Sequence, residues 1–137
     1  MSAPADPSRD GWTPRTLPGF AGLVGPLWTR REEKGWAYGV LIEERHANPA
    51  GLAHGGLIAT LADHALSVIA WEANGRRPCI TVALDVRFLA AARPGDLIVA
   101  RGRVVRQTGS LAFLDGRVTV ADVEIATASA IMSVRNG

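Results

Sequence analysis

The chain has 137 residues, enough for one domain with a hydrophobic core and too few for two. Its composition, 47% hydrophobic and 20% charged, is typical of a soluble globular protein. No apolar run reaches the roughly 18 residues of a transmembrane helix, so no membrane partner is expected. The net charge is only +2, and no basic stripe with interleaved aromatic residues is present, which argues against nucleic acid as a partner.

The N-terminal segment differs from the rest of the chain. Residues 1–14, "MSAPADPSRDGWTP", are rich in Pro, Ser and Asp and lack the apolar stretch of a signal peptide. We expect a disordered tail over residues 1–14 and a single domain over residues 15–137. The lone cysteine, Cys79, cannot form an internal disulfide and fits a reducing compartment. We therefore expect a cytoplasmic protein in which Cys79 is a small core residue rather than a nucleophile.

A hairpin and one long helix are predicted in the first part of the domain. Leu27 to Arg31 and Trp36 to Glu43 are predicted strands that turn through "EEKG". The segment "RHANPAGLAH" is predicted to be a loop because of its Asn, Pro and Gly. A helix is predicted from about Gly55 to Ala73, where "NGRRP" ends it.

After the helix the apolar residues recur with a period of two, which predicts strands. Four such segments follow: "TVALDVRFL", "LIVARGRVVR", "SLAFLDGRVTVA" and "EIATASAIMSV". Since short turns connect them, we expect them to pair as an antiparallel meander. Two strands, one apolar helix and four strands predict an α+β fold in which a sheet curls around the helix. Residues 97–106 are partly apolar on both faces, which suggests that the outer face meets another subunit.

The predicted helix carries a narrow polar stripe. Thr60, Asp63, His64 and Ser67 are spaced at i, i+3, i+4 and i+7, while most of the remaining circumference is apolar. A solvated face has the same period, but it usually contains Lys, Arg or Glu. Short polar side chains are more typical of a cleft or a subunit contact.

The same helix begins with Gly55 and Gly56, although glycine within a helix costs about 1 kcal/mol relative to alanine. Glycine is tolerated at a helix start, yet the unpaired N–H groups there can also bind the oxyanion that forms when a carbonyl is attacked. Gly55 and Asp63 are eight positions apart, about 12 Å along the axis, too far to act on one carbonyl from the same helix. If they cooperate, Asp63 comes from a second subunit, so we expect a homodimer or a homotetramer built as a dimer of dimers.

At these residues the chain resembles the hotdog-fold acyl-CoA thioesterases, in particular the phenylacetate-pathway (PaaI-like) branch. The resemblance covers about Trp28 to Val134. It rests on "NPAGLAHGGLIATLADHA", in which an Asn, a His-Gly-Gly and a helical acid keep fixed spacings, and on "TVALDVRFLAAARPGD" after it. It implies a hotdog fold, an antiparallel sheet wrapped around one long central helix. It also implies hydrolysis of an acyl- or aryl-CoA thioester to the free acid and CoA.

The resemblance further implies a role for individual residues. Asp63 falls on the general base or nucleophile, and Gly55 on the glycine whose backbone N–H polarises the thioester carbonyl. Asn48 falls on the loop residue that helps to hold this carbonyl, and His54 on the motif histidine. Thr81 matches a hydroxyl residue that orients water at the start of the next strand.

Some of these assignments stay open. A related branch uses a hydroxyl one turn beyond the acid, which is Ser67 here, and Gly56 is a possible further contributor at the helix start. The phosphates of CoA are expected near surface arginines, and the candidates are Arg76, Arg77, Arg87 and Arg93. No cofactor is implied, because CoA is part of the substrate. A thioester is already activated, so its hydrolysis requires neither a serine triad nor a metal.

The sequence was also compared with a metal site and with two other functions. The three histidines match no zinc spacing, and we expect His46 and His64 to be structural. An enoyl-thioester hydratase resembles this chain in its buried helix but depends on a His placed with an acid across the cleft. A non-catalytic acyl-CoA-binding protein would bind without turnover. The acyl group stays undetermined; residues that would line its pocket or belong to the core are Leu57, Ile58, Trp71 and Phe88.

Overall fold

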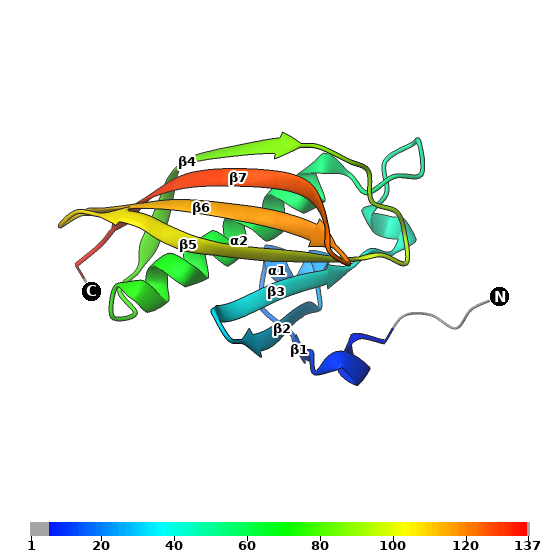
Figure 1. Ribbon diagram of the computed structural model, residues 1–137, viewed down its shortest axis with the longest axis horizontal. Coiled ribbons are helices and arrows are strands. Elements are labelled where there is room, and N and C mark those ends of the chain that lie inside the picture. Colours follow the sequence, from blue (N-terminus) through cyan, green and yellow to red (C-terminus); the bar gives the residue numbers. More distant parts are fainter. Residues whose placement is uncertain (1–5, 137) are drawn as a thin grey trace.

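The computed structural model describes residues 6–136, and its strands and helices follow the predicted order (Figure 1). The hairpin strands are β2 (Leu27–Glu32) and β3 (Gly35–Leu41), and the long helix is α2 (Gly55–Ala73). The strands after the helix are β4 (Cys79–Phe88), β5 (Leu97–Gln107), β6 (Leu111–Val120) and β7 (Val123–Val134). The shorter elements are the 3₁₀ helices η1 (Pro7–Asp10) and η2 (Glu44–His46), strand β1 (Thr13–Arg15) and helix α1 (Phe20–Val24).

The strands form one antiparallel sheet in the order β1-β2-β3-β5-β6-β7-β4. This confirms the α+β prediction, and it confirms the meander for β5, β6 and β7. The expected pairing of β4 with β5 is wrong. Instead β4 pairs with β7, from Cys79 opposite Val134 to Phe88 opposite Ala126, and forms one edge of the sheet (Figure 1).

The link between β4 and β5 explains this difference. The N–H groups of Leu89 and Ala90 both donate to the carbonyl of Ile125 in β7. A few residues on, the carbonyl of Ala92 accepts a hydrogen bond from the N–H of Ala53, just before α2. The link therefore runs across the end of the sheet, so that β5 begins beside β3. Its residues, 89–96, form a longer connection than the two- to five-residue turns of a hairpin, so the two strands need not be neighbours.

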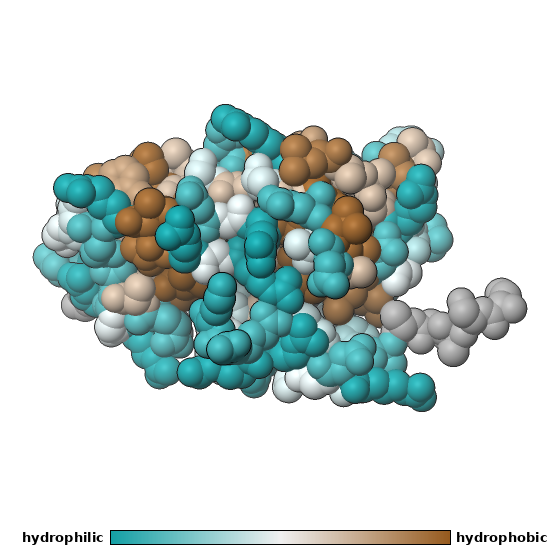
Figure 2. Space-filling model, in the orientation of Figure 1, coloured by the Kyte–Doolittle hydropathy of each residue, from teal (hydrophilic) through white to brown (hydrophobic). Residues whose placement is uncertain are grey.

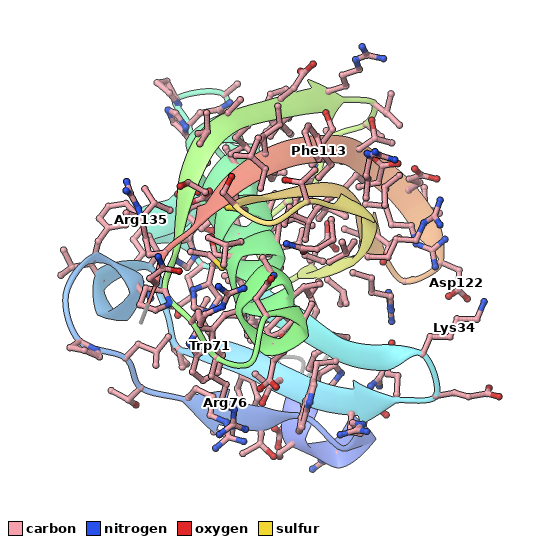
Figure 3. All side chains as sticks on the ribbon, turned by 90° about the vertical axis from the view of Figure 1, so that its left-hand side faces the viewer. Lys34, Trp71, Arg76, Phe113, Asp122 and Arg135 are labelled. Atoms are coloured by element: carbon pink, nitrogen blue, oxygen red, sulfur yellow. The ribbon has the colours of Figure 1, made fainter. Side chains whose placement is uncertain are left out.

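Helix α2 lies against the concave side of the sheet. Figure 3 shows the sheet curving around the helix, with α1 on the side that the sheet leaves open. The fully buried Leu61 and Leu66 anchor α2 in the core. Gly102 and Gly116 are opposite each other on β5 and β6, and a Cβ atom would lie 2.6 Å from Leu66 Cδ2 at Gly102 and 3.0 Å from it at Gly116. These two glycines therefore allow the helix to pack close to the sheet.

The N-terminal segment is ordered over much of the expected tail. Trp12, only 4% exposed, packs against Ala37 and Val99 on the outer face of the sheet, and the guanidinium of Arg30 lies 4.4 Å from its ring centroid. Burial of an indole and a cation–π contact hold this segment in place. The expectation of a disordered tail is therefore wrong for residues 6–14, and residues 1–5 lie outside the described part of the chain.

The outer face of the sheet is mixed in character. Figure 2, which views the molecule from the side away from α1, shows hydrophobic patches separated by hydrophilic residues. The contact of this face with another subunit stays a prediction. Among the described residues, no helix combines the length and the apolar character that crossing a membrane would require.

Candidate active site

The polar stripe of α2 faces a cavity. Thr60, Asp63, His64 and Ser67 all line a cavity of about 190 Å³, whose other walls come from α1, β2, β3 and the apolar side of the same helix turns. The stripe therefore lines a cavity and is not an ordinary solvated face, in agreement with the cleft that was one of its two predicted settings. The other setting, a subunit contact, stays a prediction. The sequence pattern did not show that α1 covers this cavity.

The carboxylate of Asp63 is held by a residue from another element. The hydroxyl of Thr81, on β4, donates a 2.7 Å hydrogen bond to Asp63 Oδ1 and also lies 3.3 Å from the sulfur of Met132. The Ser67 hydroxyl instead lies 3.8 Å from the same sulfur. Of the two hydroxyls left open by the sequence, Thr81 is the one that contacts the acid.

The loop before α2 is shaped by two of the predicted residues. Asn48 Oδ1 accepts hydrogen bonds from the N–H groups of Ala50 and Leu52, so its carbonyl oxygen closes a tight turn. His54 is the N-cap of α2, and its Nδ1 accepts a 2.8 Å hydrogen bond from the N–H of Gly56. Gly56 is thus capped within the chain, and both side chains support the helix start.

Gly55 is the first residue of α2, and within the described residues its N–H makes no hydrogen bond. A Cβ atom at this position would lie 3.3 Å from Cζ of Phe88, so the helix start packs against the end of β4. Gly55 and Asp63 remain eight residues apart on one helix, about 12 Å along its axis. One subunit therefore does not bring them to a common centre.

Two histidines have altered pKa values. His64 lines the cavity and makes an edge-to-face contact with Tyr38, at 6.2 Å between ring centroids; burial lowers its pKa, although the nearby Asp63 opposes this effect. Burial also lowers the pKa of His46. Its Nδ1 accepts from the N–H of Glu43, and its Nε2 bonds to the carbonyl of Val24. His46 therefore links η2 to α1, in agreement with the structural role that we expected.

The four candidate arginines lie in three separate places. Arg76 and Arg77 follow the C-terminal end of α2, where Arg76 lies over the ring of Trp71 and 3.6 Å from Glu72. Arg87 is on β4 opposite Thr127 of β7. Arg93 is in the link that crosses near the start of α2. They form no single cluster within one subunit.

The remaining candidates also differ in position. Leu57 lines the cavity, Phe88 packs on Gly55, and Ile58 is part of the core. The cavity residues of α1 were missed by the sequence reasoning, although "GFAGLVG", an apolar segment between glycines, was a usable signal. Burial raises the pKa of the Cys79 thiol, in keeping with a packing role. Across residues 6–136, no three His, Cys, Asp or Glu side chains are grouped to hold a metal ion.

A sheet wrapped around one helix, with a partly buried acid on that helix that lines a cavity, defines a hotdog domain with a candidate hydrolytic site. Residues 50–127 match the model of the family described as the thioesterase superfamily. The chain belongs to this superfamily, which confirms the family and the fold that the motif implied.

Individual relatives agree with this assignment. A protein of Pseudomonas aeruginosa named "Putative esterase" is 33% identical over 111 residues, 80% of this chain and 83% of its own. Human acyl-coenzyme A thioesterase 13 is 33% identical over 72 residues, 53% of this chain and 51% of its own, so the chain spans about half the length of that relative. The crystal structure of a Bacillus halodurans protein with CoA has a TM-score of 0.80 at 21% identity, covering 90% of this chain and 82% of that one, which shows the shared fold.

Proposed function

We propose that this protein hydrolyses an acyl- or aryl-CoA thioester to the free acid and CoA at a site shared by two subunits. The observation that carries the proposal is the carboxylate of Asp63, which Thr81 holds within a cavity that is otherwise largely apolar. A positioned carboxylate in such a place suits proton transfer or nucleophilic attack better than it suits stability.

The reaction needs only two kinds of group. As a general base, Asp63 accepts a proton from water while the water oxygen bonds to the carbonyl carbon. The C–S bond then breaks, and the CoA thiolate takes up the proton. As a nucleophile, Asp63 would first form an acyl anhydride that water cleaves. In both cases negative charge develops on the carbonyl oxygen, where the unpaired N–H of Gly55 would stabilise it.

Strand β4 supports the sharing of this site between subunits. It is a ten-residue edge strand with large exposed apolar side chains. Ile80, Val82 and Phe88 on the strand, and Leu89 just after it, expose between 50% and 61% of their surface in the single chain. A long apolar edge with unpaired backbone groups favours pairing with another strand. We propose that two copies of β4 pair antiparallel about a twofold axis.

The contacts along β4 indicate where this axis would lie. On β4, Thr81 lies beside Asp63, to which it donates a hydrogen bond. At the other end of the strand, Phe88 lies beside Gly55. A twofold axis through Asp85 would set side chains of the same face opposite each other across the two strands. The bulge between Thr81 and Ala83 shifts the register by one residue, so that Thr81 of one strand would lie opposite Phe88 of the other. The same register would bring Asp63 of one subunit toward Gly55 of its partner, twice per dimer. It would also set the exposed Ile80 opposite Leu89, so that both apolar ends are covered.

The test uses two variants that damage different halves of the site. Asp63→Asn removes the base and should lower the rate of thiol release from acyl-CoA by at least about 100-fold. Gly55→Pro removes the N–H and should lower the rate of thiol release about 100- to 1000-fold. The first position of a helix tolerates proline well, and the preceding residue already has an extended backbone, so the helix should still form. Gly55→Ala is the matched control, because it retains the N–H.

Co-expression of the two damaged chains then tests the sharing. In a random mixture half of the dimers are mixed, and each mixed dimer has one intact site, so activity should return to about a quarter of the wild-type value. A site contained within one subunit would show no such recovery. Unchanged turnover in Asp63→Asn would remove this residue from the mechanism.

Two rival functions are tested with the same preparation. Hydration of an enoyl-CoA without thiol release would favour a hydratase, and tight binding of acyl-CoA without turnover would favour a binding protein. The assignment to the PaaI-like branch rests on the motif, and the cytoplasmic location on the cysteine usage. Both of these assignments are proposals, and so are the absence of a cofactor and the contacts of the arginines with the CoA phosphates.

A further inference from the structure

The cavity beside Asp63 has one wall that no catalytic argument explains. This wall is α1, a five-residue helix whose Phe20, Ala21 and Val24 face the polar stripe across the cavity. We propose that this wall forms the acyl-binding subsite and sets the largest acyl group that the site accepts. This inference rests on the proposed thioester hydrolysis, because it places the acyl group relative to the reacting carbonyl.

The position of the acid fixes where the acyl group begins. For attack at about 3–3.5 Å, the carbonyl carbon must lie beside the Asp63 side chain or the water that it activates. The first acyl carbons are one or two bonds further on. Asp63 lines the cavity together with Leu57 of the same helix and with Ala21 and Val24 of α1. An alkyl or aryl group that continues from the carbonyl therefore has an apolar surface to bury itself against.

The size of the cavity limits the acyl group. Its volume is about 190 Å³, whereas an apolar cavity of about 150 Å³ accommodates benzene. A group of about six to eight carbons, cyclic or linear, matches this space. Longer chains would have to pass Phe20, which lines the cavity with 64% of its surface still exposed.

The two ends of α1 differ in how they are attached to the rest of the domain. Its C-terminal end is fixed, because the carbonyl of Val24 bonds to His46 Nε2 at 2.8 Å, and Arg45 donates to the carbonyls of Leu23 and Gly25. Its N-terminal end follows Gly19 and has no side-chain cap. The closed end of the subsite is therefore the anchored end, near Val24, and the exit is near Phe20.

The experiment measures kcat/KM for straight-chain acyl-CoA substrates from two to twelve carbons. Ala21→Leu fills the cavity and should lower kcat/KM for the six- to eight-carbon substrates at least about tenfold while acetyl-CoA changes less than about twofold. Phe20→Ala opens the exit and should move the preferred length upward by about two carbons or more. Leu23→Ala is the matched control, because Leu23 is on the same helix, is 71% exposed and does not line the cavity.

A second readout keeps this inference separate from hydrolysis itself. Calorimetric binding of S-alkyl-CoA thioethers, which cannot be hydrolysed, should show the same loss for Ala21→Leu with S-hexyl-CoA and not with S-ethyl-CoA. Wild-type protein that releases no thiol but shows this binding pattern would overturn the proposed function and leave the subsite supported. Length profiles that are unchanged in both variants, or that shift equally in Leu23→Ala, would overturn the subsite.

Discussion

Replacing Thr81 by valine tests whether its hydroxyl positions the acid. Valine has nearly the same shape, so Thr81→Val removes the 2.7 Å hydrogen bond to Asp63 without leaving a cavity. The short distance is typical of a hydroxyl that donates to a carboxylate. Hydrogen bonds to charged groups contribute about 1.5–3 kcal/mol, and if that energy orients the carboxylate during the reaction, kcat should fall about 10- to 100-fold.

The assay is thiol release under saturating and limiting substrate, so that kcat and KM are obtained separately. A positioning role predicts a loss in kcat with KM changed less than about threefold, because the hydroxyl would not hold the substrate in the ground state. Thr81→Ser retains the hydroxyl and should recover most of the loss. Ser67→Ala removes a hydroxyl whose hydrogen bond within residues 6–136 is to the Met132 sulfur and not to Asp63, so it should have little effect on kcat.

Two results would refute this reasoning. Thr81→Val with a wild-type kcat would show that the hydrogen bond does not orient the reacting carboxylate. A larger loss in Ser67→Ala than in Thr81→Val would assign the water-orienting role to the other hydroxyl, and the contact between α2 and β4 would then be structural. Thermal unfolding of each variant separates both results from simple loss of fold.

Two further predictions concern the stability of the fold. The Glu32 carboxylate is 2.7 Å from Arg101 Nε, and hydrogen bonding to this arginine lowers the pKa of Glu32 from 4.5 to about 2. The ion pair therefore stabilises the protein above about pH 4.5 and is lost as the pH falls through 2. Glu32→Gln should lower the free energy of unfolding by about 1–2 kcal/mol at pH 7 in urea titrations, a value reduced for solvent exposure, and this difference should disappear below about pH 2. Gly102→Ala should cost about 1–3 kcal/mol because the new Cβ meets Leu66, whereas Gly109→Ala, with open space around it, should change stability by less than about 0.5 kcal/mol.

The parts of the fold that could be predicted from the sequence are those that local patterning determines. The helix begins at Gly55 and ends at Ala73, as expected, because a capped start and a Gly-containing exit bracket an apolar segment. The strands follow from their period of two. The polar stripe could be assigned to a cleft or a subunit contact because it lacks long charged residues. Each of these features depends on residues close together in the chain.

The parts that could not be predicted depend on contacts between distant residues. Trp12 is in a Pro- and Asp-rich segment that looks like a tail, yet it is buried because Ala37 and Val99 provide a flat surface for its ring. The choice between Thr81 and Ser67 depends on how β4 lies against α2. Likewise, the five residues of α1 contain no periodic signal long enough to place them over the cavity.

The misplaced strand is also the one on which the proposed dimer depends. Local alternation shows that β4 has an apolar face, but it does not determine which strand pairs with it. In the strand order β2-β3-β4-β5-β6-β7, β7 would form the edge, and the segment from Thr81 to Phe88 would lie within the sheet. Asp63 and Gly55 would then remain about 12 Å apart with no route by which a twofold axis could join them. The long crossing link, by leaving β4 at the edge, makes a shared site geometrically possible.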